Sequence, residues 1–232
     1  MKILALIPAR AGSKRLPQKN IMLLAGKPLI FWSVKVALQS PIIDRVIVST
    51  DSSEIAQIAR NAGAEVPFLR PAELAADHTA DFPVFEHALV WLEQHEAYTP
   101  DLVAWLRPTS PLRTVEDLAS AFDTLLRTGA DSVRSVVEVE HHPYWMKWIE
   151  QECLVPFLSS KDETVYYQHQ LLPPVYRLNG AVDITWVAQA RLHDTLFGKT
   201  VAAYVMPRER SIDIDTIMDL KIAELLMQER GD

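Results

Sequence analysis

The chain has 232 residues, a formal net charge of −7 and 49% hydrophobic residues, which is typical of one globular domain with a sizeable core and excludes wholesale disorder. The acidic balance argues against nucleic-acid backbone binding as the main task, and Cys153, the only cysteine, excludes an internal disulfide and a cysteine zinc site. No segment approaches the roughly 20 apolar residues of a membrane span, so we expect a cytoplasmic protein with no membrane or nucleic-acid partner.

The chain opens with an apolar run, residues 3–7, that predicts a buried strand and is too short for the apolar region of a signal peptide. The turn that follows combines a glycine with four cations: Gly12, Arg10, Lys14, Arg15 and Lys19. Accessible backbone N–H groups and basic side chains at the end of a strand suit a polyphosphate, although the GxxxxGK[ST] spacing of a Walker A loop is absent. A solvated basic loop is the alternative.

Strand-like and helix-like segments then alternate, which predicts an α/β fold. Expected strands are 3–7, 45–49, 66–69, 102–106, 132–137, 181–185 and 200–206, and expected helices are 29–38, 53–61, 83–94, 115–126 and 216–228. Asp51 and Glu54 predict a capping box at the second helix, and Gly63 predicts its end. Continuous apolar strands predict a mostly parallel sheet with helices on both faces, so the basic loop, 49–51 and 107–111 should converge on one crevice.

Residues 141–179 break the alternation, because aromatic residues crowd among prolines without a clear period. We interpret them as an irregular insertion within one domain that spans residues 1–232. Exposed aromatics of this kind often form a subunit interface, and an aromatic mini-core beneath a lid is the alternative.

Near the C-terminus, Asp213 and Asp215 stand two residues apart, a spacing that points both carboxylates to one side of an extended segment. Two oxygen ligands beside a triphosphate suit Mg²⁺, whereas a surface strand with alternating acids is the alternative. Asp219 is expected to cap the last helix. The absence of HExxH and GxSxG motifs favours direct transfer between two bound substrates.

Seven motifs in order across nearly the whole chain resemble those of the acylneuraminate cytidylyltransferase family, the CMP–nonulosonate synthetases. They are Pro8 to Lys14 with Lys19-Asn20, Val48 to Asp51, Arg70 to Leu74, Arg107 to Arg113, His141 to Pro143, Tyr176 to Ala181, and Ser211 to Thr216. The resemblance implies a Rossmann-like three-layer α/β/α nucleotidyltransferase with a small insertion used for dimerisation. It also implies an enzyme that activates a nine-carbon 2-keto-3-deoxy acid sugar with CTP and Mg²⁺, or Mn²⁺, giving CMP-sugar and pyrophosphate.

The family motifs also imply roles for individual residues. The implied nucleotide contacts are Arg10, Gly12, Ser13, Lys14, Lys19, Asn20 and Arg70. The implied sugar contacts are Arg107, Thr109, Ser110, Gln170, Tyr176, Arg177 and Asn179. Asp213 and Asp215 are the implied metal ligands, and with Arg10 and Lys14 they form the implied catalytic group. The resemblance leaves the general base open.

Three departures from the family pattern lie in the sugar half. Gln168, His169 and Gln170 stand where the family usually has arginines, Arg107 replaces the glutamine of sialate members, and Asp183 replaces an aromatic residue. We interpret them as a relocation of positive charge, which predicts a legionaminate or pseudaminate substrate rather than N-acetylneuraminate. The alternatives are neutral drift around a sialate site, a 3-deoxy-manno-octulosonate cytidylyltransferase and a non-catalytic nucleotide-binding homologue.

Overall fold

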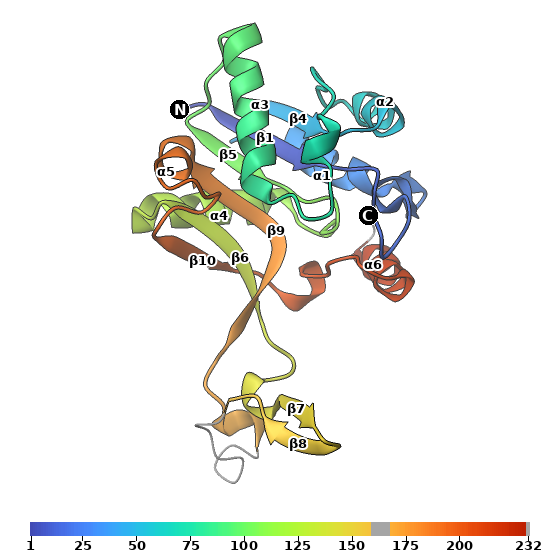
Figure 1. Ribbon diagram of the computed structural model, residues 1–232, viewed down its shortest axis with the longest axis vertical. Coiled ribbons are helices and arrows are strands. Elements are labelled where there is room, and N and C mark those ends of the chain that lie inside the picture. The colour runs from blue at the N-terminus through green and yellow to red at the C-terminus, as the bar shows by residue number, and fades with distance from the viewer. Residues whose placement is uncertain (159–167, 231–232) are drawn as a thin grey trace.

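The centre of the fold is a six-stranded sheet (Figure 1) in a computed structural model that describes residues 1–158 and 168–230. Its strands are β1 (Ile3–Pro8), β4 (Arg45–Ser49), β5 (Leu102–Trp105), β6 (Ser132–Glu138), β9 (Tyr176–Trp186) and β10 (Val201–Val205). Their order is β10-β6-β9-β5-β1-β4, and only β9 runs against its neighbours. The prediction of a mostly parallel sheet is therefore confirmed.

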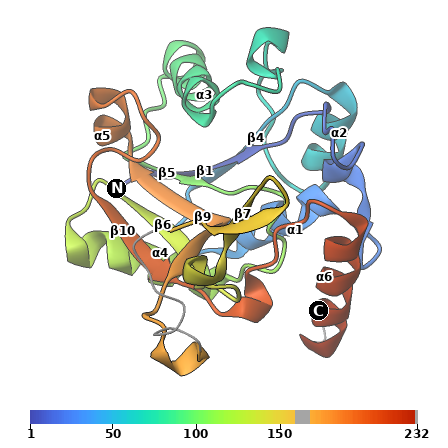
Figure 2. The ribbon, with the colours of Figure 1, turned by 60° about the horizontal axis from the view of Figure 1, so that its bottom comes forward.

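Helices cover both faces of this sheet. One face carries α1 (Leu29–Gln39), α2 (Ser53–Asn61) and α4 (Val115–Thr128), and the other carries α3 (Asp81–Glu96) and α5 (Val187–Leu192). Figure 2 shows α3 and α5 above the sheet, and α1 and α4 below it. This is the predicted three-layer α/β/α arrangement.

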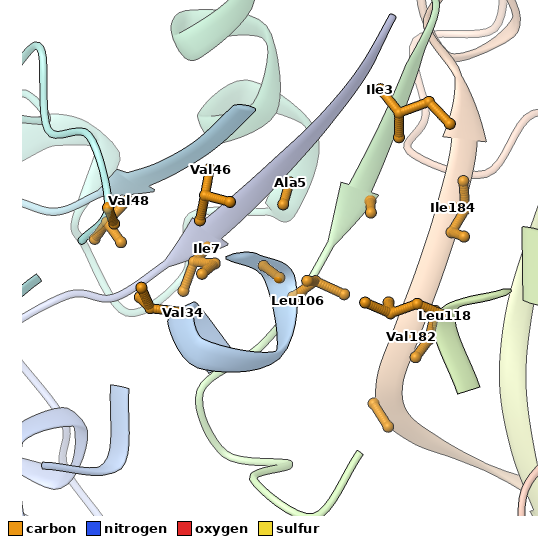
Figure 3. Close-up of a cluster of buried hydrophobic side chains, with 14 of the residues drawn as sticks. Ile3, Ala5, Ile7, Val34, Val46, Val48, Leu106, Leu118, Val182 and Ile184 are labelled. Carbon is orange, nitrogen blue, oxygen red and sulfur yellow. The ribbon is translucent and has the colours of Figure 1, made fainter. Parts of the chain in front are cut away.

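The alternating side chains of β1 explain why both layers of helices are needed. Ile3, Ala5 and Ile7 enter the cluster beneath α1, α2 and α4, which Figure 3 shows in close-up. Leu4 and Leu6 enter the cluster beneath α3 and α5. All five are at most 3% exposed, so this strand is apolar throughout because it is buried on both faces.

The C-terminal helix α6 (Ile217–Arg230) packs beside the sheet on a third apolar cluster that includes Leu16, Leu24 and Trp32. That cluster also holds the short hairpin of β2 (Leu23–Leu24) and β3 (Lys27–Pro28). Single-turn 3-10 helices lie at Lys19–Ile21, Ala72–Leu74 and Arg208–Arg210. Within the described part of the chain, no helix has the length and apolar character needed to cross a membrane.

Asp117 ties α4 to the segment that follows β10. It forms a capping box with Thr114 at the start of α4 and accepts two hydrogen bonds from Arg210, at 2.9 and 2.8 Å, and one from the hydroxyl of Tyr204 at 2.8 Å. Burial raises the pKa of Asp117, but these donors more than offset it and the pKa is lowered.

The predicted insertion extends away from the body on β6 and β9 (Figure 1). It contains an antiparallel hairpin, β7 (Lys147–Glu150) and β8 (Cys153–Pro156), between 3-10 turns at Pro143–Trp145 and His169–Leu171. The prediction of an irregular segment up to residue 179 was wrong in two respects, because the hairpin is regular and residues 176–179 belong to β9. Tyr166 and Tyr167 lie outside the described residues.

Three further sequence predictions need correction. Residues 66–69 form no strand, and only a bridge between Ile47 and Glu65 is present, since Pro67 has no N–H to donate to a sheet. The helix α5 was not predicted. Ser52, not Asp51, caps α2 by accepting a hydrogen bond from the backbone of Ile55.

Candidate active site

The carboxyl ends of β1 and β5 open on a cavity of about 270 Å³. Seven of the residues singled out from the sequence line it: Arg10, Ser13, Lys19, Asn20, Arg70, Arg107 and Thr109. The predicted convergence on one crevice is therefore confirmed for the basic loop and for residues 107–109. No residue of 49–51 lines the cavity; Ser49 and Asp51 instead bond to Arg70 and to the backbone of Ala11. Asp77, Thr79, Asp81 and Trp105 also line the cavity and were not predicted as site residues.

The basic loop after β1 is held by carboxylates from neighbouring loops. Arg10 Nη1 lies 3.0 Å from Asp77 Oδ1, and Lys14 Nζ forms a second ion pair with the same carboxylate. The hydrogen bond from Lys14 is the main reason why the pKa of Asp77 is lowered. Asp51 fixes the loop backbone by accepting a hydrogen bond from the N–H of Ala11 at 2.9 Å.

Gly12 lies at the tip of this loop. A Cβ added to it would meet no protein atom within 4 Å, so its surroundings are open to a ligand. Lys14 has a 77% exposed side chain and does not line the cavity, but its ion pair with Asp77, which does, keeps its charge beside the cavity.

The acidic pair near the C-terminus lies against the same loops. Lys19 Nζ donates to Asp215 Oδ1 and to the carbonyl of Ile214, both at 2.9 Å, and Arg15 Nη1 lies 2.6 Å from Asp215 Oδ2. The hydrogen bond from Lys19 is the largest cause of the lowered pKa of Asp215. Exposed Asp213 and half-buried Asp215 flank buried Ile214, so the alternation matches the predicted extended geometry although the segment forms no strand.

These two carboxylates have the oxygen chemistry that Mg²⁺ prefers. Across residues 1–158 and 168–230, no group of three or more His, Cys, Asp or Glu side chains is arranged to hold a metal ion. Mg²⁺ commonly takes one or two carboxylates and completes its six ligands with water and substrate phosphates. The residues therefore fit a metal site that phosphate oxygens complete.

Asp219 does not belong to this pair. Its carboxylate accepts hydrogen bonds from the N–H groups of Asp215 and Thr216, at 3.1 and 2.7 Å, just before α6. Its expected capping role is confirmed.

Arg70 and Asn20 line the buried end of the cavity. Arg70 is 6% exposed, and its guanidinium donates to the hydroxyl of Ser49 at 3.0 Å and to the Ser49 carbonyl. Burial lowers the pKa of Arg70 to about 10, so it stays charged at neutral pH. In the described part of the chain Arg70 has no ion pair with a carboxylate. Asn20 donates to the carbonyl of Arg10 at 2.9 Å and thereby fixes the start of the basic loop.

Arg107, at the end of β5, lies in a network of ion pairs. Its Nη1 and Nη2 lie 2.6 Å from Asp183 and 2.6 Å from Asp81, and Arg134 Nε lies 3.1 Å from the other oxygen of Asp183. Burial acts to lower the pKa of Arg107, but Asp183 and Asp81 more than offset it and the pKa is raised. The departures at positions 107 and 183 are thus one ion pair, and the charge of Arg107 is matched inside the protein.

The Asn-Gly-Ala motif forms a bulge where β9 passes Arg107. The register of β6 and β9 shifts between Arg134 and Val136, and Gly180 adopts a φ of +66° with its Cβ position 3.7 Å from Arg107 Cδ. Asn179 fixes the bulge, since its amide accepts from Ser135 Oγ at 2.6 Å and donates to Ser211 Oγ at 2.9 Å.

Several predicted sugar contacts lie away from the cavity wall. Ser110 is fully buried and Asn179 is 2% exposed, so their side chains lie behind the wall and position it. Tyr176 is 45% exposed and Arg177 Nη2 lies 3.5 Å from the carbonyl of Ser211, and neither lines the cavity. Gln170 is also exposed and bonds to Gln168 at 3.1 Å, whereas the side chain of the intervening histidine lies outside the description.

The chain is similar to known proteins in sequence and in structure. A family model described as "Cytidylyltransferase" matches residues 4–230. The chain is 39% identical to a CMP-N,N'-diacetyllegionaminic acid synthase of Legionella pneumophila, over 98% of the chain and 97% of that protein. It is 34% identical to a pseudaminic acid cytidylyltransferase of Campylobacter jejuni, over 97% of the chain and 96% of that protein.

Of two other matches, one spans only about half of the relative and the other has low sequence identity. An N-acylneuraminate cytidylyltransferase of Escherichia coli is 35% identical over 99% of the chain, which spans 53% of that protein. Among solved structures, a CMP:2-keto-3-deoxy-manno-octonic acid synthetase complexed with CTP has a TM-score of 0.67 at 17% identity, over 99% of this chain and 100% of that one. At that identity the likeness supports the fold alone.

Proposed function

The chain belongs to the cytidylyltransferase family, and from that premise we propose that it transfers the cytidylyl group of CTP to a nine-carbon 2-keto-3-deoxy acid sugar. The anomeric hydroxyl of the sugar attacks the α-phosphorus and loses its proton. The bond between the α-phosphorus and the oxygen that bridges to the β-phosphorus breaks, and pyrophosphate leaves with that oxygen. The observation that carries the proposal is the convergence of Arg10, Lys19 and Arg70 on one cavity at the ends of the parallel strands.

The nucleotide half is assigned as follows. Arg10, Ser13 and Lys19 contact the triphosphate from the cavity wall, with Lys14 and the N–H groups around Gly12 at the mouth. Because cations already lie beside the phosphates, charge that builds on the phosphoryl oxygens is stabilised without reorganisation.

Arg70, with Asn20 beside it, binds the cytidine end. Guanidinium donors suit cytosine O2 and N3, which are both acceptors, whereas uracil carries a donor at N3. No carboxylate of the described residues pairs with Arg70, which supports this assignment, since a buried guanidinium gains most from a ligand acceptor.

Mg²⁺ is the proposed cofactor, with Mn²⁺ as a substitute, and Asp213 and Asp215 would hold it. When bound, the metal would neutralise phosphate charge. Asp213 is exposed, whereas Asp215 already pairs with Lys19 and Arg15, so Asp213 is the principal ligand and Asp215 also keeps Lys19 in position.

The acid sugar is assigned to the outer half of the site, where Thr109 and Arg107 line the cavity and Arg177, Tyr176 and Gln170 lie beyond it. We assign the sugar carboxylate to Arg177, because the charge of Arg107 is matched internally. The 39% identity to a legionaminic acid synthase, against 35% to a sialate enzyme, supports a legionaminate-type substrate.

The proposed enzyme is a two-fold homodimer that works in the cytoplasm, where CTP is made. The projecting hairpin exposes Trp148, Ile149 and Leu154 at 55%, 76% and 70%, an apolar surface that a second copy would cover. Light scattering should give about twice 26.2 kDa. A monomer at working concentration contradicts the dimer and leaves the proposed reaction untouched.

Pyrophosphate release from CTP and Mg²⁺ tests the function across a panel of acid sugars. We expect N,N'-diacetyllegionaminate to give the highest kcat/KM, followed by pseudaminate and N-acetylneuraminate. Preference for an eight-carbon 3-deoxy acid sugar would assign the chain to the other cytidylyltransferase group. CTP binding without turnover of any acid sugar would identify a non-catalytic homologue.

A further inference from the structure

A second cavity of about 270 Å³ lies behind the loop that follows β5. Its walls come from α1, the first turn of α4, the end of α6 and residues 111–113. It shares no lining residue with the candidate active site. Residues 107–109 of the same loop line the active-site cavity instead. Neither the proposed nucleotide site nor the proposed sugar site uses it.

Arg113 in its wall is a buried cation that forms no ion pair with any carboxylate of the described residues. It is 2% exposed, its Nε donates to the carbonyl of Ser110 at 3.0 Å, and its Nη2 donates to the carbonyl of Arg107. Nη1 has no hydrogen-bond partner in the described part of the chain. Burial lowers the pKa of Arg113 to about 9, so the side chain remains a cation at neutral pH. An unsatisfied buried donor is rare in native proteins and calls for an acceptor.

The other charged groups around this cavity are mostly positive. Lys35 lies with its Nζ 5.1 Å from the centre of the Trp32 ring and has no carboxylate partner among the described residues, and Arg230 donates to the carbonyl of Leu112 at 3.0 Å. The first turn of the 14-residue helix α4 adds the partial positive charge of its N–H groups.

Among the lining residues that the structure describes, Glu116 is the only carboxylate. Its own backbone N–H is the main cause of its lowered pKa, so this carboxylate is engaged at the helix end. Among the described residues of the wall, Arg113 and Lys35 therefore have no carboxylate partner.

We propose that this second cavity binds a phosphate-class oxyanion, either free phosphate or the phosphate group of a nucleotide, through Arg113 and Lys35. The anion accepts from Nη1 of Arg113 and supplies the missing counter-charge, and Lys35 contributes a second charge-assisted hydrogen bond. The same guanidinium holds the carbonyls of Arg107 and Ser110, so the ligand binds directly behind the loop that lines the active site.

Calorimetric titration with inorganic phosphate tests this site in the Lys14→Ala variant, which weakens phosphate binding at the active site and does not touch the second cavity. Adding Lys35→Gln should weaken the remaining binding about tenfold, the loss of one charge-assisted hydrogen bond. Lys27→Gln is the matched control, because Lys27 also lies over an aromatic ring, that of Phe31 at 5.6 Å, but outside this cavity.

Titration with CMP separates the two sources of the oxyanion. Tighter Lys35-dependent binding of CMP than of phosphate identifies a nucleotide site, and equal or weaker binding identifies a free-phosphate site. Phosphate binding that is unchanged by Lys35→Gln, or absent from the Lys14→Ala variant, overturns the proposal. Both results are independent of turnover and hence of the proposed function.

Discussion

Replacing Arg107 by glutamine is expected to destabilise the fold, because it removes the partner that Asp183 and Asp81 share. Asp183 has a side chain only 3% exposed, so its charge cannot be compensated by water. Breaking a buried ion pair from one side typically costs about 3–5 kcal/mol. Arg134 remains 3.1 Å from Asp183, and we therefore expect a loss of ~2–3 kcal/mol in the free energy of unfolding.

The double variant Arg107→Gln/Asp183→Asn removes both charges of the buried pair together. It should recover at least ~1 kcal/mol relative to the sum of the two single variants, which is the coupling expected of residues in direct contact. Urea unfolding at neutral pH measures all four proteins, with the midpoint compared at constant slope. Leu38→Ala, at a half-exposed apolar position away from the network, gives the background cost of an ordinary truncation.

A loss below ~0.5 kcal/mol for Arg107→Gln, or strict additivity in the cycle, would refute the pairing. Arg107 would then be an independent cation, and the charge-relocation interpretation would explain its presence. If the cycle shows coupling, sugar preference must be compared in the double variant, since the single variant leaves a buried carboxylate unbalanced. If the double variant shifts its preference toward N-acetylneuraminate while its KM for CTP is unchanged, the Arg107–Asp183 pair determines which sugar is preferred.

The other predictions concern single side chains. Lys14→Ala should lower kcat about 100- to 1000-fold without changing the free energy of unfolding, and near-normal turnover would reduce the loop to a solvated turn. Asp213→Asn should raise the Mg²⁺ concentration for half-maximal activity more than Asp215→Asn, and equal metal dependence in wild type and both variants would remove these acids from the metal site. Asp77→Asn should lower the KM for CTP several-fold, by removing an anion beside the phosphates, and a raised KM would contradict this. The pKa of Asp117 is lowered on folding, so its stabilisation is present above the ordinary carboxyl value of 3.8 and is lost as the pH falls through its native value. The free energy of unfolding should consequently fall more steeply with decreasing pH in wild type than in Asp117→Asn. Identical pH profiles of the two proteins would contradict this role of Asp117.

The parallel core of the fold was predictable because its central strands β1, β4 and β5 are buried on both faces and are therefore mostly apolar. Residues 3–7 and 45–49 could be predicted as strands without knowing which segments pack against them. The reversed strand β9 was not predictable in direction or length, since only its second half is continuously buried, and that half contains the charged residue Asp183. Residues 66–69 have a strand-like composition, and Pro67 prevents the pairing that would make them one.

At the candidate site, contacts between side chains that are far apart in the sequence could not be predicted. The motif that contains Arg70 predicted its place in the cavity, because the motif fixes which loop carries it. The departures at Arg107 and Asp183 were visible separately, but they are 76 residues apart, and only the adjacency of β5 and β9 makes them a pair. A new cation at position 107 together with a new anion at position 183 was the available signal, and it was interpreted as a relocation of positive charge instead.

Most cations of the site are held in advance by the protein's own carboxylates. In the loop after β1, Asp77 holds Arg10 and Lys14, and Asp215 holds Arg15 and Lys19, so a bound triphosphate must replace existing ion pairs there. Exposed ion pairs contribute only about 0–1 kcal/mol, and exchanging one anion for another changes the binding free energy little. Arg70 differs, because it is buried and its described hydrogen bonds go to neutral oxygens of Ser49. Nucleotide affinity should therefore depend chiefly on Arg70, whereas the loop cations act when charge builds on the transferring phosphoryl group.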